Sequence, residues 1–253
     1  MSDALTMLRR NVRHTQRNPT TLVMTIALPV FLLLVFVGVF GGALNAGFGP
    51  PGGDYIDYLV PGILLMTVGY GAGQTAIAVN RDVTTGIISR FRTMAISRAA
   101  VLTGHVVGST IRTLISAVLV VGAAMLFGFR PDADPARWLG TIGLMTLVTL
   151  ALTWLAVAVG LSARTPEAVG PFIFVVQLLP FLSSAFVPPD SMSAAIRWFA
   201  THEPFTPIID TLRGLLLGTP VEHGGIVAIA WSVGLALAGY LWARALFRRD
   251  PAA

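Results

Sequence analysis

The residues that many enzymes use for covalent catalysis and phosphate binding are missing from this chain. It contains no cysteine, and all 17 strongly basic residues are arginine because the sequence has no lysine. Disulfides, thiolate metal sites and thiol nucleophiles are therefore excluded. Without lysine the chain cannot form a Schiff base or the GxxxxGK[ST] loop that binds phosphate in many ATPases. The sequence predicts no cofactor and no metal in this chain, and a nucleotide site of the P-loop kind must belong to another polypeptide.

Two short motifs resemble catalytic or metal-binding sites, but neither has the partners that such chemistry needs. Gly160-Leu161-Ser162-Ala163 has the Gly-x-Ser-x spacing of rhomboid-like proteases, yet no histidine is expected at the same depth to act as its base. His202 and Glu203 are adjacent, a spacing that does not place two metal ligands on one face of a helix. We interpret both motifs as ordinary polar residues near helix ends, so the chain is not predicted to be an enzyme.

A run of arginines interrupts the hydrophobic sequence between Asn80 and Arg98. The charged residues of this stretch are Arg81, Asp82, Arg90, Arg92 and Arg98. Its apolar residues recur at helical spacing, at Ile87, Ile88, Phe91 and Met94. The pattern predicts a short amphipathic helix. Such a helix can dock in a groove on a partner protein, or its arginines can bind lipid phosphates, and we favour the partner.

The composition predicts an all-α polytopic membrane protein. The chain is 55% hydrophobic and only 11% charged, whereas soluble domains carry about 25% charged residues. Several apolar runs reach the roughly 20 residues that span a bilayer as a helix. The sequence pI of about 10.7 could suggest nucleic acid, but the placement of the arginines indicates membrane orientation instead. We predict one transmembrane domain over residues 1–253 and no nucleic-acid partner.

The hydrophobic runs predict six transmembrane helices. Their approximate ranges are 22–44, 59–79, 102–128, 138–161, 168–187 and 224–243. Residues 2–18 read as an interfacial helix on anionic lipid, or alternatively as a flexible basic tail. Pro171 and Pro180 should bend the fifth span. Residues 188–218 form two apolar pieces too short to span, which fit helices at the outer interface, with Asp190 or Ser191 capping the first.

Arginine placement predicts the orientation of these spans. With both termini on the inner side, twelve arginines lie inside and four outside, whereas four acids lie inside and eight outside. Because basic residues concentrate on the cytoplasmic side, both termini should be cytoplasmic, in a bacterial plasma membrane. Arg112 is the one charge deep in a span. It either snorkels to the interface or faces a dimer seam or substrate path, where Gln74 and Gln177 offer further polar groups.

The order of several motifs resembles a known family, the membrane subunits of type-2 ABC exporters. The matching residues are Leu59-Val60-Pro61-Gly62, Asn80-Arg81-Asp82, Gly86, Arg90, Arg92, Ser97-Arg98, Phe186-Val187-Pro188, Trp198-Phe199, Glu203-Pro204-Phe205-Thr206-Pro207 and Arg213. Among these exporters, the chain is most similar to the daunorubicin-resistance permeases. His105 stands where small or basic residues are common in the family, and its role stays open.

The resemblance implies a six-helix permease that pairs with a second copy and with two P-loop ATPase subunits, which hold ATP and Mg. It assigns coupling to the ATPase to Arg81, Asp82, Gly86, Ile87, Arg90, Phe91 and Arg92. It assigns the outer re-entrant helices to the region containing Pro188, Asp190, Trp198, Phe199, Pro204 and Pro207. The expected cargo is an amphipathic drug, lipid or natural product, and the alternative is a lipid-linked glycan. A secondary transporter is disfavoured because the spans show no midplane acid and no inverted repeat.

Overall fold

The computed structural model is helical throughout and describes residues 19–48, 54–86, 98–221 and 224–248, with no β-strand in those ranges. The helices are α2 (Pro19–Leu34), α3 (Gly41–Phe48), α4 (Tyr55–Thr84), α6 (Arg98–Leu126), α7 (Pro135–Ser162), α8 (Gly170–Leu178), α9 (Ala194–His202), α10 (Phe205–Leu216) and α11 (Gly224–Arg248). The predicted N-terminal interfacial helix and the predicted amphipathic helix after Gly86 lie outside the described residues.

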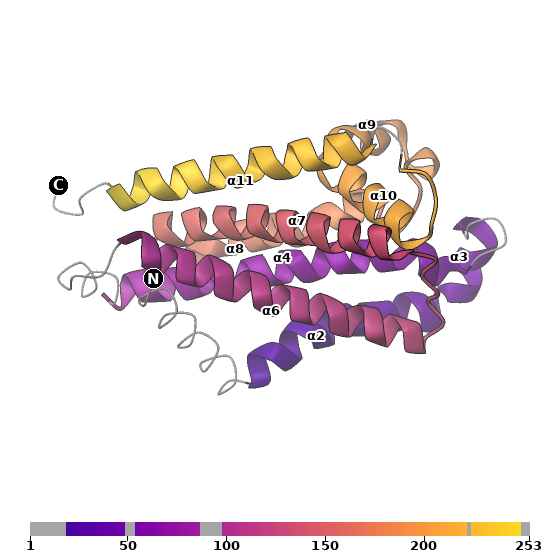
Figure 1. Cartoon of the computed structure of the whole chain (residues 1–253), viewed down its shortest axis with the longest axis horizontal. Coiled ribbons are helices and arrows are strands. Elements are labelled where there is room, and N and C mark those ends of the chain that lie inside the picture. The colour runs from indigo at the N-terminus through magenta and orange to yellow at the C-terminus, as the bar shows by residue number, and fades with distance from the viewer. Residues whose placement is uncertain (1–18, 49–53, 87–97, 222–223, 249–253) are drawn as a thin grey trace.

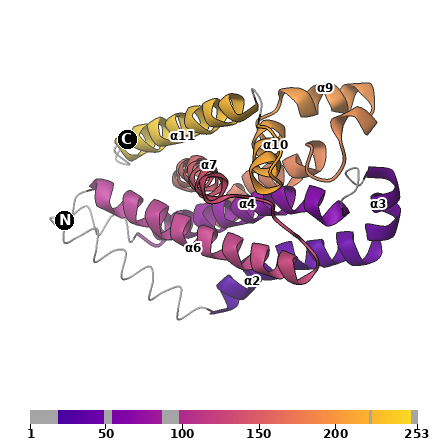
Figure 2. The same cartoon turned by 45° about the vertical axis from the view of Figure 1, so that its right-hand side comes forward.

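The long helices α4, α6, α7 and α11 lie side by side in an elongated bundle (Figure 1). At one end, α4, α7 and α11 finish and α6 and α8 begin. The short helices α3, α9 and α10 gather at the other end, which a second view brings forward (Figure 2). Following the predicted topology, we name the end where α4 finishes and α6 begins the coupling end, and the end where the short helices gather the outer end.

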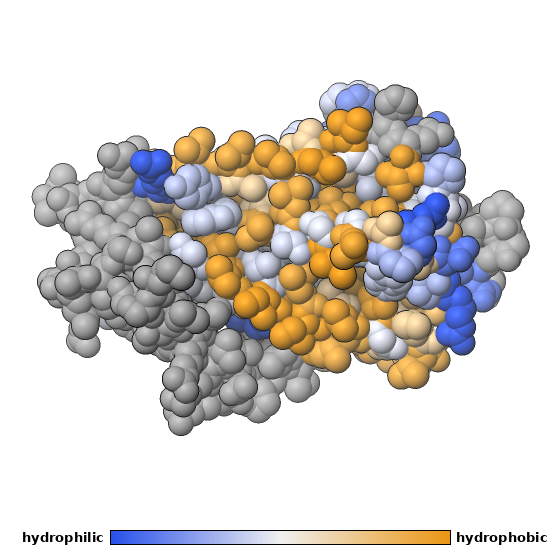
Figure 3. Space-filling model, in the orientation of Figure 1, coloured by the Kyte–Doolittle hydropathy of each residue, from blue (hydrophilic) through white to orange (hydrophobic). Residues whose placement is uncertain are grey.

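Within the described residues, four helices are long and apolar enough to cross a membrane: α4, residues Leu102–Leu126 of α6, α7, and residues Gly224–Leu246 of α11. Hydrophobic side chains cover the middle of the face in Figure 3, and hydrophilic ones gather toward the outer end. The large exposed side chains include Val118, Leu139 and Ile226, each about 70% exposed in the isolated chain. Their exposure suits a hydrocarbon solvent, so the prediction of a polytopic membrane protein is confirmed.

The predicted first and fifth spans are irregular. α2 passes into a π-helical turn at Val35–Val39 before α3 begins, and α8 passes into a 3-10 turn at Leu179–Leu182. Pro166–Leu182 is one of the shorter apolar helices, whereas α2 and its π-helical turn run from Pro19 to Val39. The count of six spans stays a prediction. Pro180 lies in the second turn as expected. The bend expected at Pro171 is wrong, because this proline lies in the first turn of α8, where its missing N–H loses no helical partner.

α4 is the buried centre of the bundle, and its glycines let other segments approach closely. A Cβ added to Gly62 would lie 2.6 Å from the Cβ of Ala185, and one added to Gly69 would lie 2.9 Å from Val176. Similar approaches join Gly71 to Thr113 of α6 and Gly73 to Ile173 of α8. Small residues favour such contacts between membrane helices, because packing rather than hydrophobic exclusion holds them together.

Gly160 makes the corresponding contact from α7 and gives a test of this packing. A Cβ there would lie 2.6 Å from the carbonyl oxygen of Ala76 and 2.9 Å from the Cβ of Val79, whereas Gly143 in the same helix has no such neighbour within 4 Å. We expect Gly160→Ala to destabilise the protein by about 1–3 kcal/mol through overpacking. The matched Gly143→Ala change should be neutral or stabilising by up to about 1 kcal/mol. Thermal unfolding in detergent measures both effects. Equal unfolding temperatures for the two variants would contradict the close contact of Gly160 with α4.

Candidate coupling site, groove and outer polar cluster

The predicted coupling residues that the structure describes lie at the C-terminal end of α4. Arg81 and Asp82 belong to the last turns of this helix, because α4 continues five residues beyond the predicted end of the span at residue 79. Their coupling role stays a prediction. Gly86 has φ +72°, a left-handed conformation that favours glycine and turns the chain away from the helix. Ile87, Arg90, Phe91 and Arg92 lie outside the described residues.

A side-chain contact joins α4 to α6 across the two ends of this connection. The Oδ2 atom of Asp82 lies 3.0 Å from Nε2 of His105, and both side chains are mostly buried, at 20% and 15% exposed respectively. Sequence reasoning left His105 without a role. The four-residue helical spacing of His105 and Ser109 was the available signal, but it identifies a partner only once the facing residues of α4 are known.

Asn80 ties the same end of α4 to α7. Its side chain is fully buried, and Nδ2 donates to the carbonyl oxygens of Gly160, at 3.2 Å, and Ala163, at 2.6 Å. These carbonyls belong to the last turn of α7 and to the residue after it. At a helix end such carbonyl groups have no N–H partner within the helix. The coupling end of α4 is therefore fixed to α6 by Asp82 and to α7 by Asn80.

The predicted interior polar residues do not form one cluster. Nη2 of Arg112 lies 3.4 Å from the hydroxyl of Ser109, one turn toward the coupling end, and Nε is buried without a partner in the described part of the chain. Gln177 of α8 likewise has a buried Nε2 with no partner among those residues. Gln74 is half-buried on α4. No hydrogen bond joins Arg112, Gln74 and Gln177 to one another in the described structure, and their roles in a substrate path or dimer seam stay predictions.

An apolar groove that sequence reasoning missed lies between α4, α6 and α7. Its volume is about 270 Å³, and it is lined by Leu64, Leu114, Ala117, Val118, Val121, Trp138, Thr141, Ile142 and Met145. The one lining hydroxyl, on Thr141, donates to the carbonyl oxygen of Arg137 at 2.9 Å. The groove suits a hydrocarbon or aromatic body. It could not be predicted because its lining comes from three helices whose register the sequence does not fix.

An arginine holds the outer turn, which is the 3-10 turn Pro189–Ser191 at the outer end of the bundle. Arg197 of α9 donates to the backbone carbonyls of Pro189, Asp190 and Met192. These carbonyls belong to, or directly follow, the 3-10 turn that Pro188 introduces. The predicted helix cap at Asp190 or Ser191 is wrong: Ser193 precedes α9, and the Ser191 hydroxyl donates instead to the carbonyl of Pro188.

The two short helices of the outer end differ in exposure. Trp198 of α9 is 65% exposed and stacks on His202 with ring centroids 4.8 Å apart, and Phe199 is also exposed. α10, which follows Pro204 and includes Pro207, is by contrast largely buried. Two outer helices too short to span are therefore present as predicted, and their re-entrant placement in a membrane stays a prediction.

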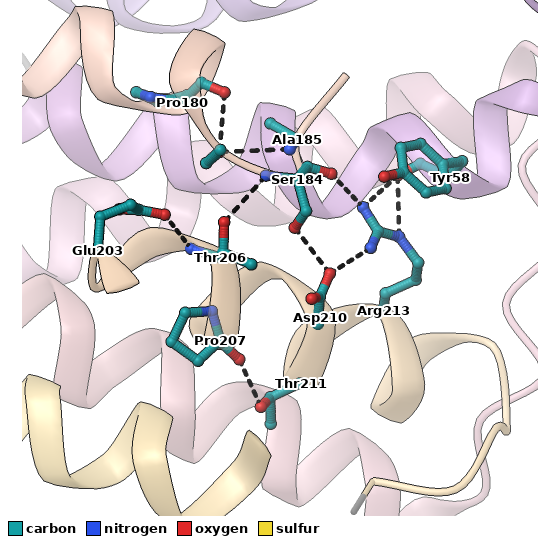
Figure 4. Close-up of polar contacts among 11 residues, drawn as sticks. Tyr58, Pro180, Ser184, Ala185, Glu203, Thr206, Pro207, Asp210, Thr211 and Arg213 are labelled. Carbon is teal, nitrogen blue, oxygen red and sulfur yellow. Dashed lines mark hydrogen bonds and ion pairs between the residues drawn. The ribbon is translucent and has the colours of Figure 1, made fainter. Parts of the chain in front are cut away.

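Arg213 of α10 is the centre of an outer polar cluster (Figure 4). Its guanidinium donates to the carbonyl of Tyr58 on α4, to the carbonyl of Ser184 at 2.8 Å, and to Asp210 at 2.5 Å. It also lies over the Tyr58 ring, 3.8 Å from the centroid. The hydroxyl of Ser184 donates to the same Asp210 carboxylate at 2.7 Å. Arg213 thus fastens three segments together at the outer end.

Glu203 caps α10 from inside the protein. Its carboxylate accepts from the backbone N–H groups of Phe205, at 2.6 Å, and Thr206, at 2.5 Å, and the residue is 5% exposed. These N–H groups are among those that a helix start leaves without partners. Burial raises the pKa of Glu203 to about 6, even though both hydrogen bonds favour the ionised form.

Apolar helices of membrane length, with charge confined mainly to their ends, define a polytopic membrane protein. The chain belongs to the ABC-2 type transporter family, whose model matches residues 3–217. The resemblance seen in the sequence is therefore confirmed. Membership of this family implies an ABC ATPase as partner.

Relatives of known description are permeases. The daunorubicin resistance ABC transporter permease protein DrrB1 of Streptomyces coeruleorubidus is 29% identical over 241 residues, covering 94% of this chain and 80% of that protein. The probable doxorubicin resistance ABC transporter permease protein DrrC of Mycobacterium tuberculosis is 26% identical over 234 residues, covering 92% and 84%. A putative transport permease of Pyropia yezoensis, ycf38, is 28% identical over 213 residues, covering 83% and 72%.

The Arg213 cluster can be tested with a change that keeps the charge. Lysine cannot reach both carbonyls and the carboxylate at once, so Arg213→Lys should destabilise the protein by about 1–3 kcal/mol. Arg130→Lys is the matched control, because exposed Arg130 bonds only the nearby carbonyls of Met125 and Phe129. Thermal unfolding in detergent should show a clear loss for the first variant only. Equal losses of stability in the two variants would contradict the central role of Arg213 in the cluster.

Glu203 predicts a pH dependence with a definite sign. Because its pKa is raised from 4.5 to about 6 in the folded protein, the folded state binds this proton more tightly than the unfolded state. The free energy of unfolding should therefore fall as pH rises from about 4.5 to 6 and be unaffected by this group above that range. Glu203→Gln should lack this component when unfolding temperatures are compared across pH 4.5–7. Parallel curves for the two proteins would contradict the assignment.

Proposed function

We propose that this protein is the membrane-spanning permease subunit of an ATP-driven exporter. It moves an amphipathic drug, lipid or natural product outward, and a separate P-loop ATPase subunit binds ATP and Mg. The observation that carries the proposal is the position of the arginine-rich connection. It joins the ends of α4 and α6, and these same two helices form the floor and one wall of the apolar groove. A push on the connection would act directly on the helices that shape the groove.

The distribution of charge supports cytoplasmic placement of the coupling end. Its arginines in the described ranges are Arg81, Arg98, Arg164, Arg244 and Arg248, against Arg130, Arg137, Arg197 and Arg213 at the outer end. Over the whole sequence, the predicted topology places twelve arginines inside and four outside. The acids of the outer end in those ranges are Asp54, Asp57, Asp132, Asp134, Asp190, Glu203 and Asp210. By the excess of basic residues on the inner side, both termini are cytoplasmic and the protein lies in a bacterial plasma membrane.

The groove and the relatives' names support an amphipathic cargo. The described groove is lined by aliphatic side chains, methionine and one tryptophan, and its lining hydroxyl is already bonded within α7. A lipid-linked glycan would need polar or aromatic groups along its path, so this alternative has less support. Daunorubicin and doxorubicin, which appear in the relatives' names, are suitable first probes. A second copy of the permease and membrane lipids complete the proposed assembly.

The amphipathic stretch after Gly86 gives the sharpest test of coupling. Arg90→Glu reverses a charge and Phe91→Ala removes an apolar anchor, so each should weaken docking on the ATPase. Loss of one anchor typically costs about 1–3 kcal/mol, a roughly tenfold or greater loss of affinity. We expect ATP hydrolysis to continue while transport into inside-out vesicles falls by a similar factor. The measurement is the ratio of daunorubicin moved to ATP hydrolysed, using the ATPase that co-purifies with the chain.

Arg164→Glu is the matched control for charge reversal. Arg164 is exposed at the coupling end but lies outside the 80–98 stretch, so its change should leave the ratio nearly intact. The thermal unfolding temperature of each variant should match the wild-type value. Transport that persists without any ATPase would contradict the proposed function.

A further inference from the structure

A line of polar and small residues runs along the contact between α4 and α6, and we name it the α4–α6 polar seam. Its three steps are Asp82 with His105, Thr75 with Ser109, and Gly71 with Thr113. The α4 residues descend in the chain as the α6 residues ascend, as expected for antiparallel helices. The seam begins at the coupling end and reaches the interior of the bundle, where α4 and α6 are otherwise apolar.

Within the seam, hydrogen bonds run in one direction from α6 to α4. The Thr75 hydroxyl donates to the carbonyl of Gly71 at 2.9 Å, so it must accept in its 2.5 Å contact with Ser109. Ser109 therefore donates to Thr75 and accepts from Nη2 of Arg112 at 3.4 Å. A relay of three bonds thus links the Arg112 guanidinium to the backbone of α4.

The seam is only partly satisfied in this arrangement. Thr113 and Ser116 are fully buried, yet their hydroxyl oxygens have no partner within the described residues, and neither does Nε of Arg112. Buried polar groups without partners are unfavourable, above all in a membrane, where no bulk water compensates. All three groups belong to α6, so a second register of this helix against α4 is one in which they could find partners.

The seam is also built to permit such a displacement. Glycine and short hydroxyl side chains leave no large side chain interlocked between α4 and α6 at Gly71, Thr75 and Ser109. The contact of α7 with α11 is different, because Trp154 and Tyr240 meet edge to face with centroids 5.0 Å apart. Helix shifts of about 1–2 Å along an interface are a common way to switch between two packed states.

We propose that the α4–α6 polar seam is the sliding contact of the permease, and that Asp82 and His105 are positioning residues that latch it at the coupling end. The inference rests on the proposed function, since the coupling stretch joins the two helices that the latch connects. When the ATPase moves residues 87–97, the latch opens or shifts and α6 slides along α4. The Ser109 hydroxyl then exchanges its hydrogen-bond partners, and the wall of the groove that α6 forms moves with this helix.

A disulfide across the seam tests the sliding step, because the natural chain has no cysteine. The γ oxygens of Thr75 and Ser109 are 2.5 Å apart, close to the roughly 2.05 Å of a disulfide bond. The Thr75→Cys, Ser109→Cys double variant should therefore cross-link with little strain. The control is the Gly140→Cys, Leu215→Cys pair, which joins α7 to α10; a Cβ at 140 would lie 4.0 Å from Cγ of Leu215, the position that a cysteine sulfur would take.

The assay uses the full permease with its co-purified ATPase in proteoliposomes, and the probes are daunorubicin and a fluorescently labelled phosphatidylethanolamine. Oxidation of the seam pair should abolish ATP-dependent movement of the probe, and reduction should restore it to the level that the same double variant shows before oxidation, whereas the control pair should move the probe equally in both states. An oxidised seam pair as active as the control would overturn the inference while leaving the proposed function intact. If the wild-type and reduced proteins move neither probe with ATP, the proposed function fails and the inference falls with it.

The latch is tested by exchange of its residues. His105→Gln and Asp82→Asn should each raise the ATP hydrolysed per molecule transported, by about tenfold if a charge-assisted hydrogen bond is lost. The Asp82→His, His105→Asp double exchange should recover most of the coupling. His202→Gln, on the outer helix α9, is the matched control and should leave the ratio unchanged. If the double exchange performs as badly as the single variants, the two residues do not act as a latch.

Discussion

Close packing around α4 is the constraint on which the rest of the structure depends. Between membrane helices there is little hydrophobic driving force, so contact distance decides how well segments hold together. Gly62, Gly69, Gly71 and Gly73 receive Ala185, Val176, Thr113 and Ile173, which come from three different segments. At these four positions no side chain of α4 separates it from its neighbours, so three segments can approach its backbone closely. The position of α4 therefore fixes where the groove, the coupling end and the outer end lie relative to one another.

The polar contacts that join α4 to α7 and α10 lie near the two ends of the bundle. At the coupling end Asn80 holds the carbonyls of α7, and at the outer end the carbonyl of Tyr58 accepts from Arg213. These buried hydrogen bonds anchor α4 to α7 and α10, and the Oδ1 atom of Asn80 lacks a partner among the described residues. The contact with α6 contains the unsatisfied hydroxyls instead. In the proposed sliding step, the contacts with α7 and α10 are the fixed side of α4 and the contact with α6 is the moving side, a division that suits a transport cycle between two states.

The sequence predicted the features that depend on local pattern. Hydropathy located α4, α6, α7 and α11, and Pro180 marked the change of helix type after α8. Features that depend on tertiary contact could not be predicted. α4 continues past residue 79 because Asn80 finds carbonyls of α7, and α7 begins at Pro135 because Asp134 accepts from the N–H of Arg137. The contact of His105 and the lining of the groove can be identified only when the relative positions of three helices are known. Of the predicted coupling residues, Arg81, Asp82 and Gly86 could be placed, and their contact with the ATPase stays a prediction.

The central claim is that the coupling end faces the cytoplasm, where an ATPase can reach it. The most direct measurement uses the cysteine-free chain with a single cysteine at Thr85, an exposed residue directly after α4, and a membrane-impermeant maleimide. The account predicts labelling of Thr85→Cys in inside-out vesicles but not in intact cells, and the reverse for Asp190→Cys at the outer turn. Labelling of Thr85→Cys in intact cells would contradict the orientation, and with it the route by which ATP hydrolysis moves the permease.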